Sequence, residues 1–411
     1  MNKPVLMSLD QAIEAMLAYA AVNPSIETIA TLDADQRVLA QDIHSEIQVP
    51  AFDNSAMDGY AFTHADLLPQ QSIFQPGQRI PAGQVPKPHQ PGQADRVFTG
   101  AAIPPGADTV VMQEECEVLP DGRIRIQSQP KRGQCVRQKG EDIGLQDTIL
   151  TQGQVLNPAS LGLLASVGLA RVPVFTQPKV ALFSTGDELI MPGDVAPADL
   201  PPGAIFNSNR FFLKSLLQRS GCVVTDRGIL TDNLEATREA FAQAAQTHDV
   251  ILTSGGVSVG EEDHVKPAIQ SLGELHLWSL AIKPGKPFAY GQIQAGGRLT
   301  HFMGLPGNPV SSFITFLLLA HPFLRRLQGV CQPSAVAYTL RADFAWPKAD
   351  KRREFLRVKR NAKGGLDLFA NQGSGVLTSV AWADGVVDNP PEKTIAPGDL
   401  VSFIPFTHGL S

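Results

Sequence analysis

The chain has 411 residues, of which 43% are hydrophobic and 18% are charged, and its formal net charge is −6. This length exceeds one ordinary hydrophobic core, so several domains are expected. The negative charge argues against broad nucleic-acid binding, which requires a basic face. The four cysteines lie far apart without a C-x-x-C pair, so the sequence indicates neither a zinc site nor a disulfide framework and fits a reducing compartment.

The N-terminus predicts a helix and no secretory signal. Ser8-Leu9-Asp10-Gln11 is a capping-box pattern, and the apolar residues that follow mark one face of an acidic amphipathic helix. The longest apolar stretch, residues 313–320, is too short to span a membrane and should end at His321-Pro322. We therefore expect a soluble, cytoplasmic protein that contacts no membrane.

Residues 50–62 form an unusual run of small, amide and acidic residues between two aromatic residues. One interpretation is a surface turn at Asp58-Gly59. The other is a loop that offers Asp53, Asn54, Ser55 and Asp58 to a polar ligand. The local pattern favours neither interpretation over the other.

Residues 63–140 are rich in proline and glycine and contain short β-like runs, which predict a small β domain. A helix should then begin at Asn157-Pro158 and end at Gly168. The prolines of residues 173–178 are typical of a hinge into the next domain.

From residue 179 onward, buried strands alternate with helices. The apolar run 180–183 ends in Ser184-Thr185-Gly186-Asp187-Glu188, and a helix capped within residues 207–209 should end before Gly221. The next strand leads to Asp232, which we expect to cap a second helix.

Two further strand ends repeat this pattern. Residues 250–253 run into Ser254-Gly255-Gly256, and residues 301–303 run into Gly304-Leu305-Pro306-Gly307-Asn308-Pro309, where Asn308 should cap a helix. Such alternation predicts a doubly wound, parallel sheet, in which ligands bind outside the carboxyl ends of the strands.

The residues at these strand ends suggest a site for a nucleotide-like ligand. Glycines allow backbone N–H groups to approach an anion, and a divalent cation held by Glu188, Asp232 or Asp263 would bridge to its phosphate. Lys283 and Lys286 add positive charge. Each feature alone has a structural explanation, as a tight turn, a helix cap or an exposed lysine, and only their convergence favours a site.

After residue 330 the pattern changes to short alternating runs, which predict a small β-barrel. Basic residues crowd its start: Lys348, Lys351, Arg352, Arg353, Arg357, Lys359 and Arg360. The aromatic residues that single-strand nucleic-acid binders use are sparse, so a basic rim over an anionic small molecule is favoured over an RNA-binding barrel.

Motifs along the whole chain carry a resemblance to a known family. They are Phe52-Asp53-Asn54-Ser55-Ala56-Met57-Asp58-Gly59-Tyr60-Ala61, Thr99-Gly100-Ala101, Gly140-Glu141-Asp142-Ile143, Ser184-Thr185-Gly186-Asp187-Glu188-Leu189, Ser254-Gly255-Gly256-Val257-Ser258-Val259-Gly260, Lys283-Pro284-Gly285-Lys286-Pro287 and Gly304-Leu305-Pro306-Gly307-Asn308-Pro309. In this order, the set resembles the molybdopterin molybdenumtransferases of molybdenum cofactor synthesis, which are related to the C-terminal part of gephyrin.

The resemblance implies an enzyme that loads molybdate onto adenylylated molybdopterin and releases AMP, with Mg²⁺ as the divalent cation. It also implies a homodimer with shared active sites, in which Asp58, Thr99 and Asp142 of one subunit face the α/β domain of the other. Molybdopterin adenylyltransferase and apo-molybdoenzymes are the implied partners, and nucleic acid is not.

The predicted site combines both lines of reasoning. We assign catalysis to Asp58, Asp142, Glu188, Lys283 and Lys286; metal binding to Glu188, Asp232 and Asp263; and substrate binding to Thr99, Ser184, Thr185, Gly186, Ser254, Gly255, Gly256, Ser258, Pro306, Gly307, Asn308, Pro309, Arg352 and Ser374. Arginines bind a tetrahedral dianion such as molybdate as they bind phosphate.

We therefore predict a multidomain α/β plus β protein. Residues 1–49 and 141–177 form a helical or mixed N-terminal domain, 50–140 an inserted β domain, 178–329 a doubly wound α/β domain and 330–411 a C-terminal β-barrel. Two alternatives stay open: an adenylyltransferase for the preceding step, because the α/β domain alone resembles that enzyme, and a gephyrin-like scaffold. The additional β domains argue against the first alternative, and the lack of a gephyrin-type linker and N-terminal domain argues against the second.

Overall fold

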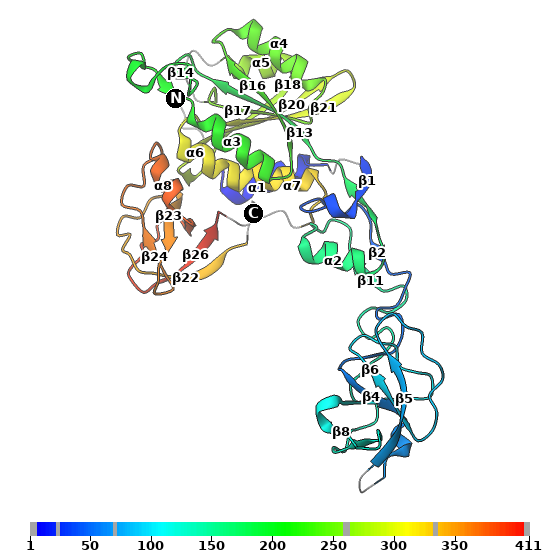
Figure 1. The fold of residues 1–411 in the computed structure, drawn as a ribbon. Coiled ribbons are helices and arrows are strands. Elements are labelled where there is room, and N and C mark those ends of the chain that lie inside the picture. Colours follow the sequence, from blue (N-terminus) through cyan, green and yellow to red (C-terminus); the bar gives the residue numbers. More distant parts are fainter. Residues whose placement is uncertain (1–5, 22–24, 69–71, 258–263, 332–335, 407–411) are drawn as a thin grey trace.

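The computed structural model describes residues 6–21, 25–68, 72–257, 264–331 and 336–406. Figure 1 shows an elongated molecule in which an α/β domain lies beside a barrel, while a small β domain lies at the far end of a narrow neck. The predicted multidomain α/β plus β architecture is confirmed. The residue boundaries that we assigned to the domains stay predictions.

Within the described residues, six strands form the sheet of the α/β domain in the order β16-β13-β17-β21-β20-β18. The parallel strands are β13 (Lys179–Thr185), β16 (Val223–Leu230), β17 (Val250–Ser254) and β21 (Arg298–Leu305). The antiparallel strands β20 (Pro287–Ala295) and β18 (Gly273–Ser279) extend one edge. Because the first four strands run the same way, their carboxyl ends meet along one edge.

Both faces of this sheet are covered by helices, because alternate side chains of a strand point to opposite faces. Val180 and Leu182 pack in one core, and Ala181 and Phe183 pack in another. The first core contains residues of α1 (Leu9–Tyr19), α3 (Ser208–Arg219), α6 (Pro309–Thr315), the π-helical segment η5 (Phe316–Ala320) and α7 (His321–Leu327). The second contains residues of α4 (Leu234–Ala245) and α5 (Val265–Leu272).

The predicted helix caps at the starts of α1 and α3 are confirmed, and the one at the start of α4 is wrong. Ser8 accepts from Gln11 N in the predicted capping box, and Asn207 accepts from Arg210 N at the start of α3. The predicted cap of α4 is wrong, since Asn233 Oδ1, not Asp232, accepts from Ala236 N at 2.9 Å. Asn233 directly precedes Leu234, the first residue of α4, which places Asp232 one position before the cap.

The apolar helix of the α/β domain is longer than predicted. It continues through His321-Pro322, so that residues Pro309–Leu327 form one run with a mean hydropathy of 1.2, long and apolar enough to cross a membrane. In the structure, 89% of this window is buried inside the protein, as in a core helix. The π-helical turn η5 precedes Pro322 and widens the helix where a proline ring would clash with the preceding turn.

The N-terminal helix packs far from the strands that follow it in sequence. α1 contacts α7 and η5 in the α/β core, although our sequence division assigned it to the N-terminal domain. The other N-terminal elements form a separate layer: β1 (Ile26–Ala30) with β12 (Arg171–Phe175), η1 (Thr31–Asp33), β2 (Ile43–His44) with β11 (Thr148–Leu150), and α2 (Pro158–Ser166). The prolines expected to form a hinge therefore begin inside a paired strand.

The small β domain is built from local strands on a sheet with the order β7-β4-β6-β5-β9-β8. These are β4 (Gly59–Phe62), β5 (Ser72–Ile80), β6 (Gln93–Val97), β7 (Thr109–Met112), β8 (Cys116–Val118) and β9 (Ile124–Ile126), with the 3₁₀ turns η2 (His64–Asp66) and η3 (Gln113–Glu115). The short pair β3 (Asn54–Ser55) and β10 (Val136–Arg137) lies at its connection to the neck.

The C-terminal domain is a closed barrel, as predicted. Within residues 336–406, five strands close because β23 pairs with both β24 and β25: β22 (Tyr338–Ala342), β23 (Arg353–Arg360), β24 (Gly365–Leu368), β25 (Gly385–Asn389) and β26 (Leu400–Pro405). The helix α8 (Leu377–Trp382) lies beside it. The short strand β19 (Ile282–Lys283) of the α/β domain pairs with β23 and joins the two domains.

Truncation of Phe241 should destabilise the α/β domain. Its side chain is fully buried on α4, with its ring 5.4 Å from Phe183 and 5.8 Å from Phe302. Phe241→Ala should lower the free energy of unfolding by about 3–5 kcal/mol, because it leaves a cavity between helix and sheet. Urea unfolding measures this, and Phe211→Ala is the control, since Phe211 is 55% exposed on α3. Equal effects of the two variants would contradict the assigned packing.

Candidate functional site

A cavity of about 770 Å³ opens at the carboxyl ends of the parallel strands. Its wall comes from the loops that follow β13, β16, β17 and β21 and from the start of α3. The predicted residues that line it are Thr185, Gly186, Glu188, Asp232, Ser254, Gly255, Gly256, Pro306, Gly307, Asn308 and Pro309. The structure therefore gathers these residues around one space, and their substrate-binding role stays a prediction.

Ser184, which we also predicted for the site, does not belong to the described lining of the cavity. Ser184 is buried within β13, and its hydroxyl has no hydrogen-bond partner among the described residues. Ser258 and Asp263 lie outside the described residues.

The glycines after β17 allow close packing at the floor of the cavity. Gly255 and Gly256 have φ values of 96° and 68°, and a Cβ on Gly255 would lie 2.6 Å from Thr185 Oγ1. Gly255 N donates to Leu305 O at 2.9 Å, so this N–H is already used within the fold. A side chain at either position would therefore both strain the backbone and fill space beside Thr185.

Asn209 connects two of the strand-end loops. Its Nδ2 donates to Ser254 Oγ at 2.8 Å and to Gly307 O at 2.7 Å. The side chain is buried on α3 and lines the cavity. The sequence showed Asn209 only as part of a helix start, because nothing in local spacing reveals a bond to residues about 45 and 98 positions away.

Glu188 and Asp232 are the carboxylates among the described lining residues. A Cβ on Gly186 would lie 2.3 Å from Glu188 Oε2, so the glutamate side chain folds back against this glycine. Among the described residues no cluster of three metal-ligating side chains occurs, and the third predicted ligand, Asp263, lies outside them. Carboxylate oxygens suit Mg²⁺, which binds through one or two carboxylates plus water and substrate phosphates, so the pair fits such an ion.

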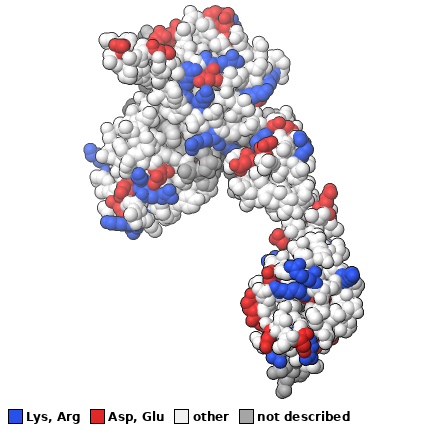
Figure 2. All heavy atoms as spheres, viewed as in Figure 1, with Lys and Arg blue, Asp and Glu red and all other residues white. Residues whose placement is uncertain are grey.

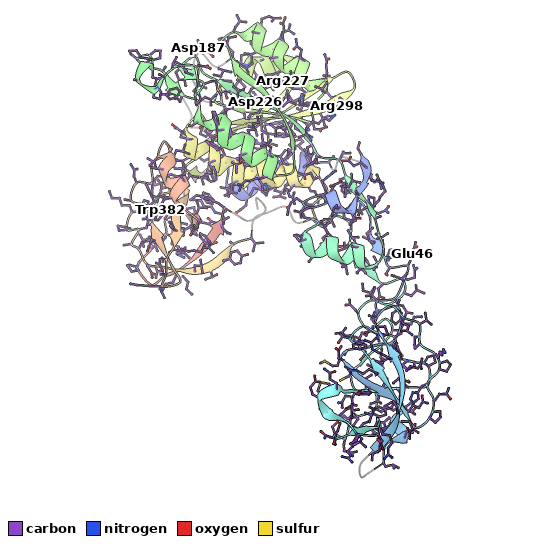
Figure 3. The ribbon with its side chains drawn as sticks, in the orientation of Figure 1. Glu46, Asp187, Asp226, Arg227, Arg298 and Trp382 are labelled. Atoms are coloured by element: carbon purple, nitrogen blue, oxygen red, sulfur yellow. The ribbon has the colours of Figure 1, made fainter. Side chains whose placement is uncertain are left out.

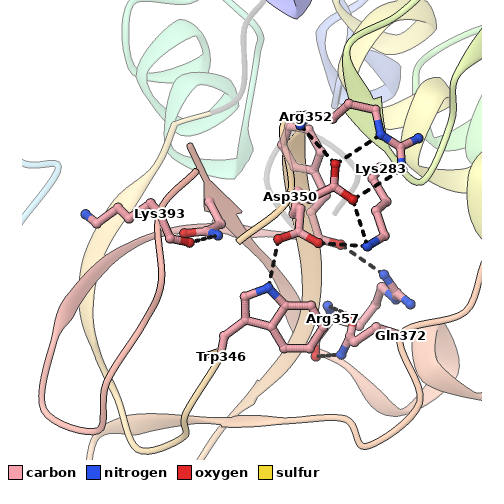
Figure 4. Close-up of polar contacts among 10 residues, drawn as sticks. Lys283, Trp346, Asp350, Arg352, Arg357, Gln372 and Lys393 are labelled. Atoms are coloured by element: carbon pink, nitrogen blue, oxygen red, sulfur yellow. Dashed lines mark hydrogen bonds and ion pairs between the residues drawn. The ribbon is translucent and has the colours of Figure 1, made fainter. Parts of the chain in front are cut away.

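Ion pairs neutralise much of the basic start of the barrel (Figure 4). Lys283 Nζ lies 3.1 Å from both Asp350 and Glu354, and Arg352 lies 3.3 Å from Asp350. The Arg352 hydrogen bonds hold the pKa of Asp350 well below its usual range. Burial opposes the charge of Lys283, but its bonds to Glu354 and Asp350 raise its pKa overall.

Several residues of the predicted basic rim are therefore paired with acids. Arg353 pairs with Asp388 and Asp10, and Arg360 pairs with Asp384. Figure 2 shows the same mixture on a larger scale, with acidic and basic side chains interspersed over the face it displays. Lys286, in contrast, is exposed and lies next to Pro287, which lines the cavity.

Arg357 is a cation that the sequence placed in this rim but that the structure buries. Its side chain donates to Ser379 Oγ at 3.1 Å, Phe355 O at 3.0 Å and Gly373 O at 3.3 Å, and among the described residues no carboxylate pairs with it. Burial lowers its pKa to about 10. The loop above it reaches the cavity, since Ser374 O accepts from Val310 N and Gly375 lines the wall.

The sequence predicts Arg357 only as part of the basic rim, because its burial depends on the barrel closing around it. Arg352, our predicted ligand, is engaged by Asp350, whereas Arg357 keeps a positive charge without an acidic partner in the described chain. An unpaired buried cation attracts anions strongly, because the surroundings screen it poorly.

Asp58 and Thr99 form a hydrogen-bonded pair in the β domain. Asp58 Oδ1 accepts from the backbone N and from Oγ1 of Thr99, both at 2.8 Å, and these bonds lower the pKa of Asp58. A Cβ on Gly59 would lie 1.9 Å from Val111 O, so the residue after Asp58 must be glycine. Asp142 is exposed near the neck, where its N–H donates to Val49 O.

These three residues lie far from the cavity within one chain. Figure 3 places Asp187, the neighbour of Glu188, at the outer end of the α/β domain and Glu46 at the neck, and the β domain lies beyond Glu46. The predicted site residues therefore form two groups that a single chain does not bring together.

Replacement of Thr99 should change the ionisation of Asp58. Thr99→Val removes the hydroxyl bond and keeps the backbone bond, so the depressed pKa of Asp58 should rise part of the way toward its ordinary value. A ¹³C NMR titration of the aspartate carboxylates measures this. Thr63→Val, which removes a bond to the carbonyl of Gly106, should leave the pKa of Asp58 unchanged; an unmoved pKa in Thr99→Val would contradict the assigned role of the hydroxyl.

Comparison with known proteins places almost the whole chain in one family. Residues 7–168 match the MoeA N-terminal region (domain I and II), residues 181–326 a probable molybdopterin binding domain, and residues 339–406 the MoeA C-terminal region (domain IV).

Individual relatives also match over most of the chain. The chain is 38% identical to a molybdopterin molybdenumtransferase of Haemophilus influenzae, over 98% of this chain and 99% of that one. It is also 38% identical to one of Nostoc sp., over 88% and 84% of the two chains. The crystal structure of a molybdopterin biosynthesis MoeA protein from Pyrococcus horikoshii matches with 31% sequence identity and a TM-score of 0.78, over 98% of this chain and 99% of that one.

Proposed function

Because the chain belongs to the MoeA family of molybdopterin molybdenumtransferases, we propose that it inserts molybdate into adenylylated molybdopterin, with release of AMP, in the cytoplasm. The strand-end cavity carries this proposal. It combines glycine-lined loops, the carboxylates Glu188 and Asp232, and the start of α3 within the segment that matches a molybdopterin-binding domain. Such a cavity suits a ligand that contains both a phosphate and a planar ring.

We assign different residues of the site to the nucleotide phosphates and to molybdate. Glu188 and Asp232 would hold Mg²⁺, which supplies charge neutralisation on the phosphoanhydride when bound. Lys286 stays exposed beside the cavity and offsets the charge of the departing AMP. The charge of Arg357, beneath the loop of Gly373 and Gly375, draws the molybdate dianion to the barrel side of the cavity.

We propose that a second copy completes the site, as the family resemblance implies. Asp58, Thr99 and Asp142 are separated from the cavity within one chain by the length of the neck, so only another subunit can present them to Glu188. A homodimer of isologous symmetry would create two such sites. Analytical ultracentrifugation should find twice the chain mass, and a monomer at micromolar concentration would contradict the arrangement.

The direct test of the function is release of AMP. The purified protein with adenylylated molybdopterin and Mg²⁺ should release AMP in the presence of molybdate, and the product should activate a cofactor-free molybdoenzyme. Formation of adenylylated molybdopterin from ATP and molybdopterin, without molybdate-dependent AMP release, would assign the chain to the preceding step instead.

Glu188→Gln should weaken the response to Mg²⁺. The variant keeps the size of the side chain and loses one carboxylate charge at the cavity, so the Mg²⁺ concentration for half-maximal AMP release should rise at least about tenfold. Asp187→Asn is the matched control, since Asp187 is exposed and does not belong to the described lining. The same Mg²⁺ dependence in Glu188→Gln and the wild type would exclude Glu188 as a ligand.

A further inference from the structure

Asn207 carries a buried donor that the described residues do not use. It lies at the start of α3, is 1% exposed and lines the cavity. Its Oδ1 accepts from Arg210 N at 3.2 Å as the helix cap. Its Nδ2 is buried and has no acceptor among the described residues.

The cap fixes which way this amide is oriented. Exchange of the oxygen and nitrogen of Asn207 would place an N–H group against the N–H of Arg210, so the amide cannot turn over to satisfy Nδ2. A buried donor without an acceptor is unfavourable and rare in folded proteins. Asn157 shows that the capping role does not require a buried amide, since it caps α2 through Oδ1 and its residue is exposed to water.

The surroundings of Asn207 favour an anionic acceptor. Asn207 N donates to Ile190 O, and Ile205 N donates to Glu188 O, so β15 (Ile205–Phe206) holds Asn207 next to the segment that follows Glu188, β14 (Leu189–Ile190). Two residues on, Asn209 binds the loops of Ser254 and Gly307. The first-turn N–H groups of α3, a helix of 12 residues, add partial positive charge at the same place.

We propose that Asn207 is a substrate-binding residue whose Nδ2 donates a hydrogen bond to an oxyanion oxygen in the cavity. The acceptor is a tetrahedral oxyanion, either the phosphoryl group of the nucleotide or molybdate. The assignment rests on the proposed function and adds a neutral donor to the cation site formed by Glu188 and Asp232. An amide suits this position because it binds the oxyanion without competing with the cation for it.

Two substitutions separate the donor from the cap. Asn207→Ser keeps a side-chain oxygen that caps α3 and removes the amide N–H, whereas Asn207→Asp keeps the cap and replaces the donor by a carboxylate. The matched control is Asn157→Asp, which makes the same change at the cap of α2, outside the cavity. In thermal unfolding, all three variants should have a Tm close to that of the wild type.

Isothermal titration calorimetry with AMP plus Mg²⁺, and separately with molybdate, is the readout. Asn207→Ser should weaken one of the two ligands by about ten- to a hundredfold, the range expected for one hydrogen bond to a charged acceptor. Asn207→Asp should weaken it further by repulsion, and Asn157→Asp should change neither. The ligand that responds identifies the oxyanion.

Unchanged affinity for both ligands in Asn207→Ser and Asn207→Asp would overturn the assignment of Asn207, and so would an equal loss in Asn157→Asp. These outcomes leave the proposed function standing if the wild type binds the ligands and releases AMP. A wild type that binds neither ligand and releases no AMP would contradict the proposed function and the role of Asn207 together.

Discussion

The parallel pairing of β13, β16, β17 and β21 is the constraint on which the site depends. It places four strand-end loops along one edge of the sheet. Because alternate side chains point to opposite faces, the strands pack against one hydrophobic core on each face, and these two cores hold the sheet in place. Asn209 then connects the loops of Ser254 and Gly307 through hydrogen bonds of 2.8 and 2.7 Å. The cavity is thus a consequence of strand direction, and a buried amide connects two of its loops.

On the barrel side of the cavity, most basic side chains that we described are paired with acids, and Arg357 is not. Lys283, Arg352 and Arg353 are paired with acids, so their contribution to the field at the cavity is small. Arg357 is buried with neutral acceptors and keeps its charge beneath a loop that reaches the cavity. The strand β19 joins the two domains through β23, and Gly375 of the barrel domain lines the cavity together with the strand-end loops.

Local pattern was sufficient for much of the fold. The strands at 180–183, 250–253 and 301–303 were predictable because continuous apolar runs ended in polar and glycine residues, and Asn207, Asn157 and Ser8 were recognisable as caps. The cap of α4 was misplaced by one residue, because Asp232 and Asn233 are both good capping residues and only the helix start decides between them. The length of the apolar helix was underestimated, because sequence alone does not show that a π-helical turn accommodates Pro322.

The site was less predictable than the fold. Ion pairing of Arg352, burial of Arg357 and the orphan donor of Asn207 each depend on residues distant in sequence, which composition and spacing do not report. We propose that Asp58 of one subunit acts with Glu188 of another. Mixing inactive Asp58→Ala and Glu188→Ala dimers after reversible dissociation tests it: AMP release should return to roughly a quarter of the wild-type rate, since half of the dimers then hold one intact site. A mixture that stays inactive, although subunits have exchanged, would contradict a shared site.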